Sequence, residues 1–372
     1  MSSLRTRLLV AAVMMVLPVS LLSACGKAGG SGVDLNSLVA QAKTEGDAAR
    51  ATFTPAMKEA IAAAEAEGSV SLMSGSAQYT QAEQKVLAEA LNAYFGTHLS
   101  VATNSIGSAS VAYQQVLQSF KAGASPQVDL WVSSLDYNVL LGQQHALEAV
   151  DWAALGAKDS DVLTFEGTSS LYIQDYIRGL YYNTNAIDEA SAPTTWDGLL
   201  APQYKGKICT AAVPSIFPTI GLVIGHPEAL SLVTKLVNDQ GMKLLPSLSQ
   251  VQQAVADGQC WIGFGGGTEP LSSQGAPLAD APLKIGAIPA GAVVMKNAPH
   301  AAAAKLLSYF LSETNAGGLI GYNILGWMKH TQPGTEIYDV AHKGGVAVAP
   351  LDFQQTVVPA WSPKFAKVLG VG

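Results

Sequence analysis

The sequence predicts an α/β protein in which strands and helices alternate along most of the chain. Three segments of the first half each combine a short apolar strand with a serine-rich loop that opens a helix: 69–79, 99–110 and 128–137. Further strands are predicted within 176–187, where an Asn-containing turn follows, within 207–219, where a proline-containing loop leads to a helix, and within 249–270, where a helix precedes the strand and a glycine-rich turn follows it. Strands that alternate with helices form βαβ units, whose strands are parallel. We therefore expect helices packed on mostly parallel sheets.

Local signals place several element boundaries. The chain from 33 to 67 is alanine-rich and predicted to be helical. Thr80 and Glu83 form a T-x-x-E capping box, and apolar pairs at helical spacing follow it. Gly258 is placed to end the helix that begins near Ser249.

Composition and charge narrow the classes of protein. The 372 residues include 13% charged side chains and carry a formal net charge of −7, with lysine and arginine scattered singly. An acidic balance of this kind argues against a nucleic-acid partner. The length suggests two domains with sizeable cores.

The N-terminus has the pattern of an export signal that ends at a cysteine. Arg5 and Arg7 precede an apolar run over 8–22, which is short for a membrane span of ~20 residues. The letters LSAC that end at Cys25 resemble the bacterial lipobox, whose cysteine is acylated. We expect residues 1–24 to be removed, Cys25 to carry lipid, and the glycine-rich stretch after it to act as a tether. An ordinary signal peptide or an uncleaved anchor is the alternative.

The loops that follow the strands contain the candidate ligand contacts, because ligands of open α/β sheets bind beyond the carboxyl ends of the strands. Hydroxyls and helix N-termini could hold an anion, whereas Asp136 and Glu269 with aromatic rings could hold an organic cation. A helix cap alone also accounts for each serine, so both ligand classes stay open. The candidates are Ser74, Ser76, Tyr79, Ser108, Ser133, Ser134, Asp136, Tyr182, Ser215, Thr219, Gly267, Thr268 and Glu269.

Motifs of common enzymes and metal sites do not occur in the sequence. It contains no G-x-S-x-G, H-E-x-x-H or S-x-x-K, and its six histidines include no pair at i, i+3 or i, i+4. The glycine run 265–267 is not followed by the lysine of a P-loop. We expect no enzymatic activity, no cofactor and no metal.

Two cysteines remain once Cys25 is lipidated. Cys209 and Cys260 each lie on an expected strand, two or three residues before a ligand-facing loop. An even number of cysteines in an oxidising compartment favours a disulfide. Two separate buried thiols are the alternative.

Several motifs resemble one protein family, in the same order along the chain. Residues 193–208, PTTWDGLLAPQYKGKI, resemble the P-x-T-W-x-D-L-x-x-P segment with its following K-G-K-I in bacterial ABC-transporter solute-binding proteins. The group includes ferric-ion, thiamine, polyamine and phosphonate binders. AEAEGSVSLMSGS, LYYNTNAI and KNAPHAAAAKLLSYFLSE fit the same family pattern. The resemblance covers nearly all of the chain from Met57 onward.

The resemblance implies a two-lobed periplasmic-binding-protein-like fold of type II, with the ligand cleft between the lobes. Crossover strands would lie near 177–182 and 285–295. The expected organisation is a lipidated tether with a helical segment at 25–66, lobe 1 at 67–176 plus 285–372, and lobe 2 at 177–284.

Iron is not the expected ligand. Ferric-ion members place two adjacent tyrosines after the strand that here reads CWIGF, whereas this chain has GGGTEP at 265–270. Iron(III) needs hard anionic oxygens such as phenolates, and this loop offers only Glu269. The adjacent Tyr181 and Tyr182 lie in a crossover strand, where strand packing accounts for them.

The resulting hypothesis is a lipid-anchored solute-binding component of an ABC importer. It would be an extracytoplasmic monomer that its lipid holds to the cell membrane, on the periplasmic or outer face, with a small-molecule ligand and the permease subunits as partners. The expected ligand is an amine, a phosphonate or an amino-phosphonate. An exported two-lobed enzyme and a ligand-sensing lipoprotein are the alternatives.

Overall fold

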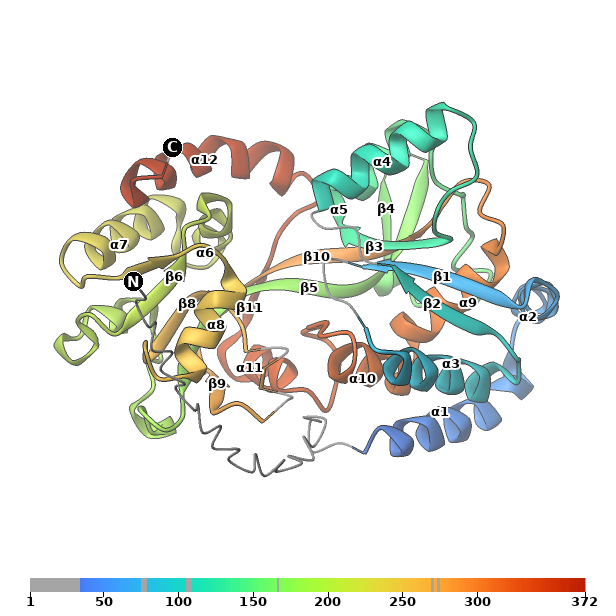
Figure 1. Ribbon diagram of the computed structural model, residues 1–372, viewed down its shortest axis with the longest axis horizontal. Helices are drawn as coiled ribbons and strands as arrows, with labels where there is room; N and C mark the ends of the chain where they lie inside the picture. Colours follow the sequence, from blue (N-terminus) through green and yellow to red (C-terminus); the bar gives the residue numbers. More distant parts are fainter. Residues whose placement is uncertain are drawn as a thin grey trace, which may run out of the picture.

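The computed structural model has two α/β lobes joined by long strands (Figure 1). It describes residues 34–74, 79–104, 109–165, 167–268, 271–272 and 275–371. The order of strands along the sheet is β2-β1-β3-β10-β5-β8-β6-β7. Short 3₁₀ turns connect the elements: η1 (Arg50–Thr52), η2 (Asp159–Asp161), η3 (Glu189–Ser191), η4 (Trp196–Leu200), η5 (Pro202–Tyr204) and η6 (Pro214–Ile216).

Lobe 1, on the right of Figure 1, contains the predicted parallel βαβ units. Strand β1 (Ser69–Ser74) pairs in parallel with both β2 (Ser100–Asn104) and β3 (Leu130–Ser134). The predicted capping box is present: Thr80 and Glu83 bond reciprocally at the start of α3 (Gln81–Phe95). The other helices of this lobe are α1 (Leu35–Ala49), α2 (Pro55–Glu67), α4 (Ala109–Lys121), α5 (Leu135–Gln143), α9 (Ala301–Glu313) and α10 (Asn315–Asn323).

The first two helices belong to lobe 1. Leu38 and Ala42 of α1 and Met57 and Ala64 of α2 are buried in the same apolar cluster as Leu72 of β1. The chain from 34 onward is therefore part of the lobe, and the boundary expected at residue 67 lies too late.

Lobe 2 contains a smaller mixed sheet covered by helices. Its strands are β6 (Ile208–Ala211), β7 (Lys243–Leu245), β8 (Ile262–Gly266) and β9 (Leu278–Asp280), and its helices include α6 (Phe217–Ile224), α7 (His226–Asn238) and α8 (Leu248–Ala256). Helix α8 is capped by Ser247, so it starts before the expected Ser249. Strands β6 and β8 are parallel neighbours. A disulfide joins Cys209 and Cys260, whose Cα atoms are 6.0 Å apart.

The C-terminal helix packs on lobe 2, although the sequence placed it in lobe 1. Helix α12 (Phe353–Leu369) lies on the lobe at the left of Figure 1. Its Phe365 is fully buried against Phe217, with ring centroids 5.3 Å apart, and Leu369 joins the same apolar cluster. The chain therefore returns to lobe 2 after passing through lobe 1.

Two antiparallel strands connect the lobes. Strand β5 (Thr168–Asn183) pairs with β10 (Ile285–Val294) from Leu171 to Arg178, and then continues into the lobe 2 sheet. Strand β4 (Val162–Phe165) pairs with β5, and strand β11 (Val346–Val348) pairs with β10. Helix α11 (Glu336–Gly344) directly precedes β11 in the chain. We call β5 and β10 the hinge strands. Within the ranges that the structure describes, no helix has the length and apolarity that crossing a membrane requires.

Candidate functional site

One face of the hinge strands carries Tyr176 and Arg178. Side chains alternate along a strand, so these two residues point away from Asp175 and Ile177. Arg178 lies directly opposite Gly286 on β10, and residues opposite one another in an antiparallel pair share a face. We call the face of Tyr176 and Arg178 the hinge face.

Lobe 1 brings a carboxylate to the hinge face. Asp136 lies in the first turn of α5, directly after β3. Burial raises the pKa of Tyr176 to about 12, and the charge of Asp136 contributes to that rise. Tyr137, on the same helix as Asp136, and Tyr79, just before α3, also act on Tyr176 electrostatically. The carboxyl end of β3 therefore reaches the hinge near Tyr176, since Ser134 lies opposite Ala290 on β10 and Tyr176 lies opposite Ile288.

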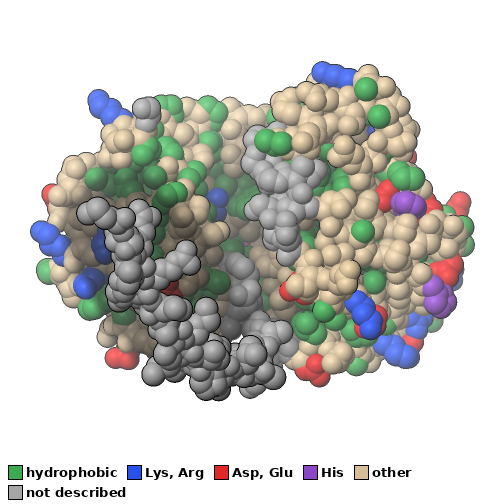
Figure 2. Space-filling model, viewed as in Figure 1, with side chains coloured by type: hydrophobic (Ala, Val, Ile, Leu, Met, Phe, Trp, Pro, Cys, Tyr) green, Lys and Arg blue, Asp and Glu red, His purple; other side chains and the backbone are tan. Residues whose placement is uncertain are grey.

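Lobe 2 brings the first turn of α6 to the same face. A Cβ atom on Gly286 would lie 2.7 Å from the carbonyl oxygen of Thr219, so only glycine allows this approach. Leu222, one turn later in α6, and Tyr176 both pack against the apolar cluster that contains Ile288. Because Gly286 and Arg178 share a face, Thr219 and Arg178 lie in the same part of the molecule. Both lobes thus contribute to the hinge face, and Figure 2 shows the surface hollowed between them.

Three side chains of the hinge face have a buried polar atom without a hydrogen-bond partner among the described residues: Asp136 Oδ1, Arg178 Nε and Thr219 Oγ1. An unpaired buried polar group costs ~1–3 kcal/mol, and more when it is charged. These groups are therefore unusual unless a ligand satisfies them.

The charges of this face are held at an electrostatic cost. Burial lowers the pKa of Arg178 from 12.5 to about 10. Burial also raises the pKa of the Asp136 carboxyl, against hydrogen bonds from Ser134 and from backbone N–H groups that lower it. Arg178 Nη1 donates to the Ile177 carbonyl at 2.8 Å, and no ion pair of Arg178 occurs in the part of the chain that the structure describes.

The structure gives other predicted candidates in lobe 1 internal partners. Ser74 Oγ accepts a hydrogen bond from Trp327 Nε1 at 3.0 Å. The Tyr79 hydroxyl donates to the Leu325 carbonyl at 3.2 Å. Ser133 is buried and donates to Asn138 Oδ1 at 2.6 Å. These hydroxyls hold the strand ends of lobe 1 in place.

The candidates of lobe 2 do not all meet at the hinge face. Thr268 is buried and donates to Asp280 Oδ2 at 3.0 Å. Gly267 faces Met328, whose sulfur would lie 3.0 Å from an added Cβ atom. Tyr182, four residues beyond Arg178 on β5, is buried and lines a separate cavity of ≈ 390 Å³. Ser215 is exposed on η6. Ser76, Ser108, Glu269 and Cys25 lie outside the described residues.

Arg178 was not among the site residues predicted from the sequence. It is a single arginine within YIRGLYY, a segment otherwise typical of a buried strand. Charged side chains are rarely buried without a partner, so a charge in the middle of an apolar crossover strand was the available signal.

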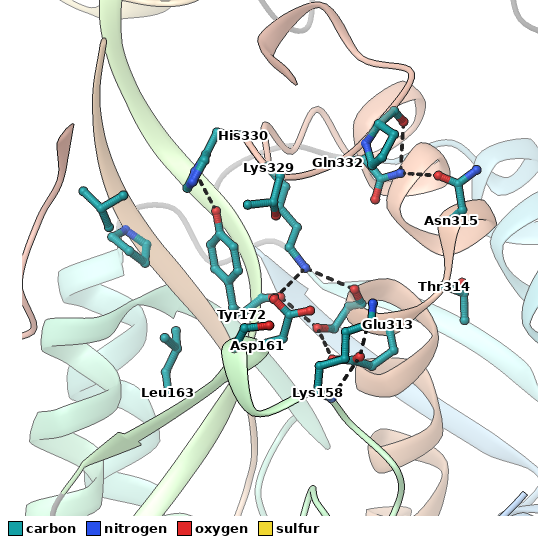
Figure 3. Close-up of a pocket in the computed structure, with 16 residues that line it drawn as sticks. Lys158, Asp161, Leu163, Tyr172, Glu313, Thr314, Asn315, Lys329, His330 and Gln332 are labelled. Atoms are coloured by element: carbon teal, nitrogen blue, oxygen red, sulfur yellow. Dashed lines mark hydrogen bonds and ion pairs between the residues drawn. The ribbon is translucent and has the colours of Figure 1, made fainter. Parts of the chain in front are cut away.

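A second polar cavity, of ≈ 570 Å³, is lined by Tyr172 and by loop residues 329–333 (Figure 3). Next to it, Asp175 accepts a hydrogen bond from the Tyr172 hydroxyl and lies 2.7 Å from His330 Nδ1. Lys329 Nζ lies 3.6 Å from Asp161 and donates to the Ser312 carbonyl at 3.1 Å. These charges pair with one another, in contrast to those of the hinge face.

Solved structures with the same architecture are periplasmic binding proteins. A substrate-binding protein of an ABC transporter from Agrobacterium tumefaciens is 13% identical, with a TM-score of 0.61 over 82% of this chain and 96% of that one. A spermidine/putrescine ABC-transporter substrate-binding protein from Streptococcus pneumoniae is 16% identical, with a TM-score of 0.58 over 81% and 98%. A ferric iron-binding protein from Mannheimia haemolytica is 15% identical, with a TM-score of 0.57 over 81% and 98%.

The fold is therefore that of a two-lobed periplasmic binding protein, as the sequence predicted. The chain belongs to the bacterial extracellular solute-binding protein family, whose model matches residues 87–321. No protein among the curated sequences matches this chain.

Proposed function

We propose that this protein is the solute-binding component of an ABC importer and that it captures a small polar organic solute at the hinge face. The candidate ligands are an amine, a phosphonate and an amino-phosphonate. The observation that carries the proposal is the set of buried polar atoms that both lobes bring to the hinge strands and that have no partner among the described residues. A solute that bonds to groups of both lobes favours the closed arrangement, which the permease would then recognise.

The surroundings of the adjacent tyrosines support an organic solute over iron(III). Tyr181 is fully buried, and its ring covers Gly263 so closely that an added Cβ atom would overlap it. Burial and the nearby Asp280 also raise the pKa of its phenol far above the usual value. A phenol in this environment resists becoming the phenolate that iron(III) would require.

The direct test identifies the bound solute. We expect a small polar organic molecule to co-purify with the full chain, to be released by denaturation and to be found by mass spectrometry. Adding it back should raise the melting temperature, because a solute at a hundredfold excess over its Kd stabilises the native state by ~2.7 kcal/mol. Conversion of the solute into another compound would favour an enzyme. A purple complex with iron(III) would contradict the choice of ligand class.

We also propose that Cys25 anchors the protein to the membrane. Cys25→Ser should leave an unprocessed precursor or release the protein into the soluble fraction, because lipidation requires the thiol. Ser31→Ala, six residues further along, changes the tether and leaves the cysteine intact, so it should fractionate with membranes. A Cys25→Ser protein that is processed and membrane-bound like the wild type would show that the anchor is elsewhere.

A further inference from the structure

We infer that the solute is a small zwitterion whose oxyanion binds Arg178 and whose protonated amine binds Asp136. This inference rests on the proposed function and chooses among the three ligand classes that the proposal leaves open.

Arg178 is the oxyanion site. Its Nε is buried without a partner among the described residues, and its hydrogen bond from Nη1 to the Ile177 carbonyl leaves other guanidinium N–H groups available. A guanidinium presents parallel N–H groups that match a carboxylate, phosphate or phosphonate. The Thr219 hydroxyl, also buried without a partner in the described part of the chain, adds a neutral donor from lobe 2. Arginine and threonine together favour an oxyanion at this end of the hinge face.

Asp136 is the amine site. Hydrogen bonds from Ser134 and from backbone N–H groups already stabilise this carboxylate, while its Oδ1 has no partner among the described residues. Tyr137 and Tyr79 raise the pKa of Tyr176, as does the charge of Asp136. A carboxylate oxygen beside aromatic rings suits an ammonium group, because both attract the same charge.

Tyr176 separates the two charges. Along β10, Ser134 lies opposite Ala290, Tyr176 opposite Ile288 and Arg178 opposite Gly286, so Tyr176 lies between the end of the strand that leads to Asp136 and Arg178. Arg178 Nε and Asp136 Oδ1 are not bonded to each other or to any other described residue, so these groups do not neutralise each other across the hinge face. A zwitterion that extends past Tyr176 would pair with both. A simple amine or a simple phosphonate would leave one buried charge unpaired, which is costly.

The test measures affinity by titration calorimetry on the full chain in detergent, after its own solute has been removed. The probes are two zwitterions, 2-aminoethylphosphonate and β-alanine, and two singly charged analogues, ethylphosphonate and propylamine. We expect the better zwitterion to bind at least about tenfold more tightly than either analogue, because each charge-assisted bond contributes a factor of about 10 to 100.

Two substitutions assign the two ends. Arg178→Gln should weaken the zwitterion and ethylphosphonate by about 10- to 100-fold and leave propylamine unchanged. Asp136→Asn should weaken the zwitterion and propylamine and leave ethylphosphonate unchanged. Lys205→Gln and Asp257→Asn make the same changes in net charge at exposed positions of lobe 2 and should change no affinity.

Opposite selectivity of the two variants supports the inference, and equal losses for all probes or no losses overturn it. If Arg178→Gln does not fold, Arg178→Lys replaces it, and the same selective loss for oxyanions is required. Failure to bind either zwitterion overturns the inference too. A co-purifying solute with one charge or none would overturn it while leaving the proposed function intact, whereas the absence of any co-purifying solute would count against the proposed function itself.

Discussion

Replacing Arg178 by methionine should stabilise the protein when no solute is bound. Burial lowers the pKa of Arg178 from 12.5 to about 10. At about 1.4 kcal/mol for each pKa unit, burial of the charge costs the folded state ~3 kcal/mol. The side chain is half-buried, so solvent reduces this cost. The hydrogen bond to the Ile177 carbonyl, worth ~1 kcal/mol, is also lost in the variant. We expect a net gain of ~1–2 kcal/mol in the free energy of unfolding.

The gain depends on pH in a defined direction. The pKa of Arg178 is lower in the folded protein than in the unfolded chain, so the cost of burial is fully present below pH of about 10. It decreases as the pH rises from there toward 12.5, where the unfolded side chain also loses its proton. The stabilising effect of Arg178→Met should therefore be complete at neutral pH and shrink in strong alkali.

Urea unfolding of the solute-free protein, followed by circular dichroism, measures this effect. Arg50→Met is the matched control, because Arg50 is also half-buried but donates to the Ala93 and Tyr94 carbonyls and pairs with Asp47. Loss of these partners should destabilise the protein by ~1–3 kcal/mol. An Arg178→Met variant that is destabilised as much as Arg50→Met would refute the reasoning, since it would mean that Arg178 supports the fold.

Three more outcomes follow from the structure. Alkylation without reductant should leave Cys209 and Cys260 unmodified in intact-mass measurements, and two alkylated thiols would contradict the disulfide. Replacing both cysteines by alanine should lower the free energy of unfolding by ~4 kcal/mol, because the disulfide closes a loop with a sequence separation of 51. Gly286→Ala should cost ~1–3 kcal/mol and weaken solute binding, because its methyl group would press against the Thr219 carbonyl; wild-type unfolding and affinity would show that α6 does not contact the hinge. Affinity for propylamine should fall as the pH is lowered from neutral toward the raised pKa of Asp136, because only the ionised carboxylate attracts the protonated amine. If the affinity of the Asp136→Asn variant for propylamine fell equally over this pH range, another group would be responsible.

The elements of this protein follow from local patterns in the sequence. The capping box of Thr80 and Glu83 joins groups three residues apart, so the four letters T-x-x-E are sufficient to predict it. The alternation of strands and helices predicts parallel strands, and β6, which carries Cys209, is a parallel neighbour of β8. Cys260 was expected on a strand but lies two residues before β8 begins. The two-lobed fold was predicted from motifs in their order along the chain, and the structural comparisons confirm it.

The hinge face was decided only by the tertiary structure. Asp136 and Thr219 were candidates from their places after strands, but nothing in the letters says that both approach the same two hinge strands. Arg178 was missed because the importance of a buried charge depends on its partners. Those partners would come from segments tens of residues away, and only the folded chain shows that none is present among the described residues. The placement of α12 on lobe 2 could not be predicted for the same reason. An apolar helix face could pack on either lobe, and only the folded chain shows that Phe365 packs against Phe217 in lobe 2.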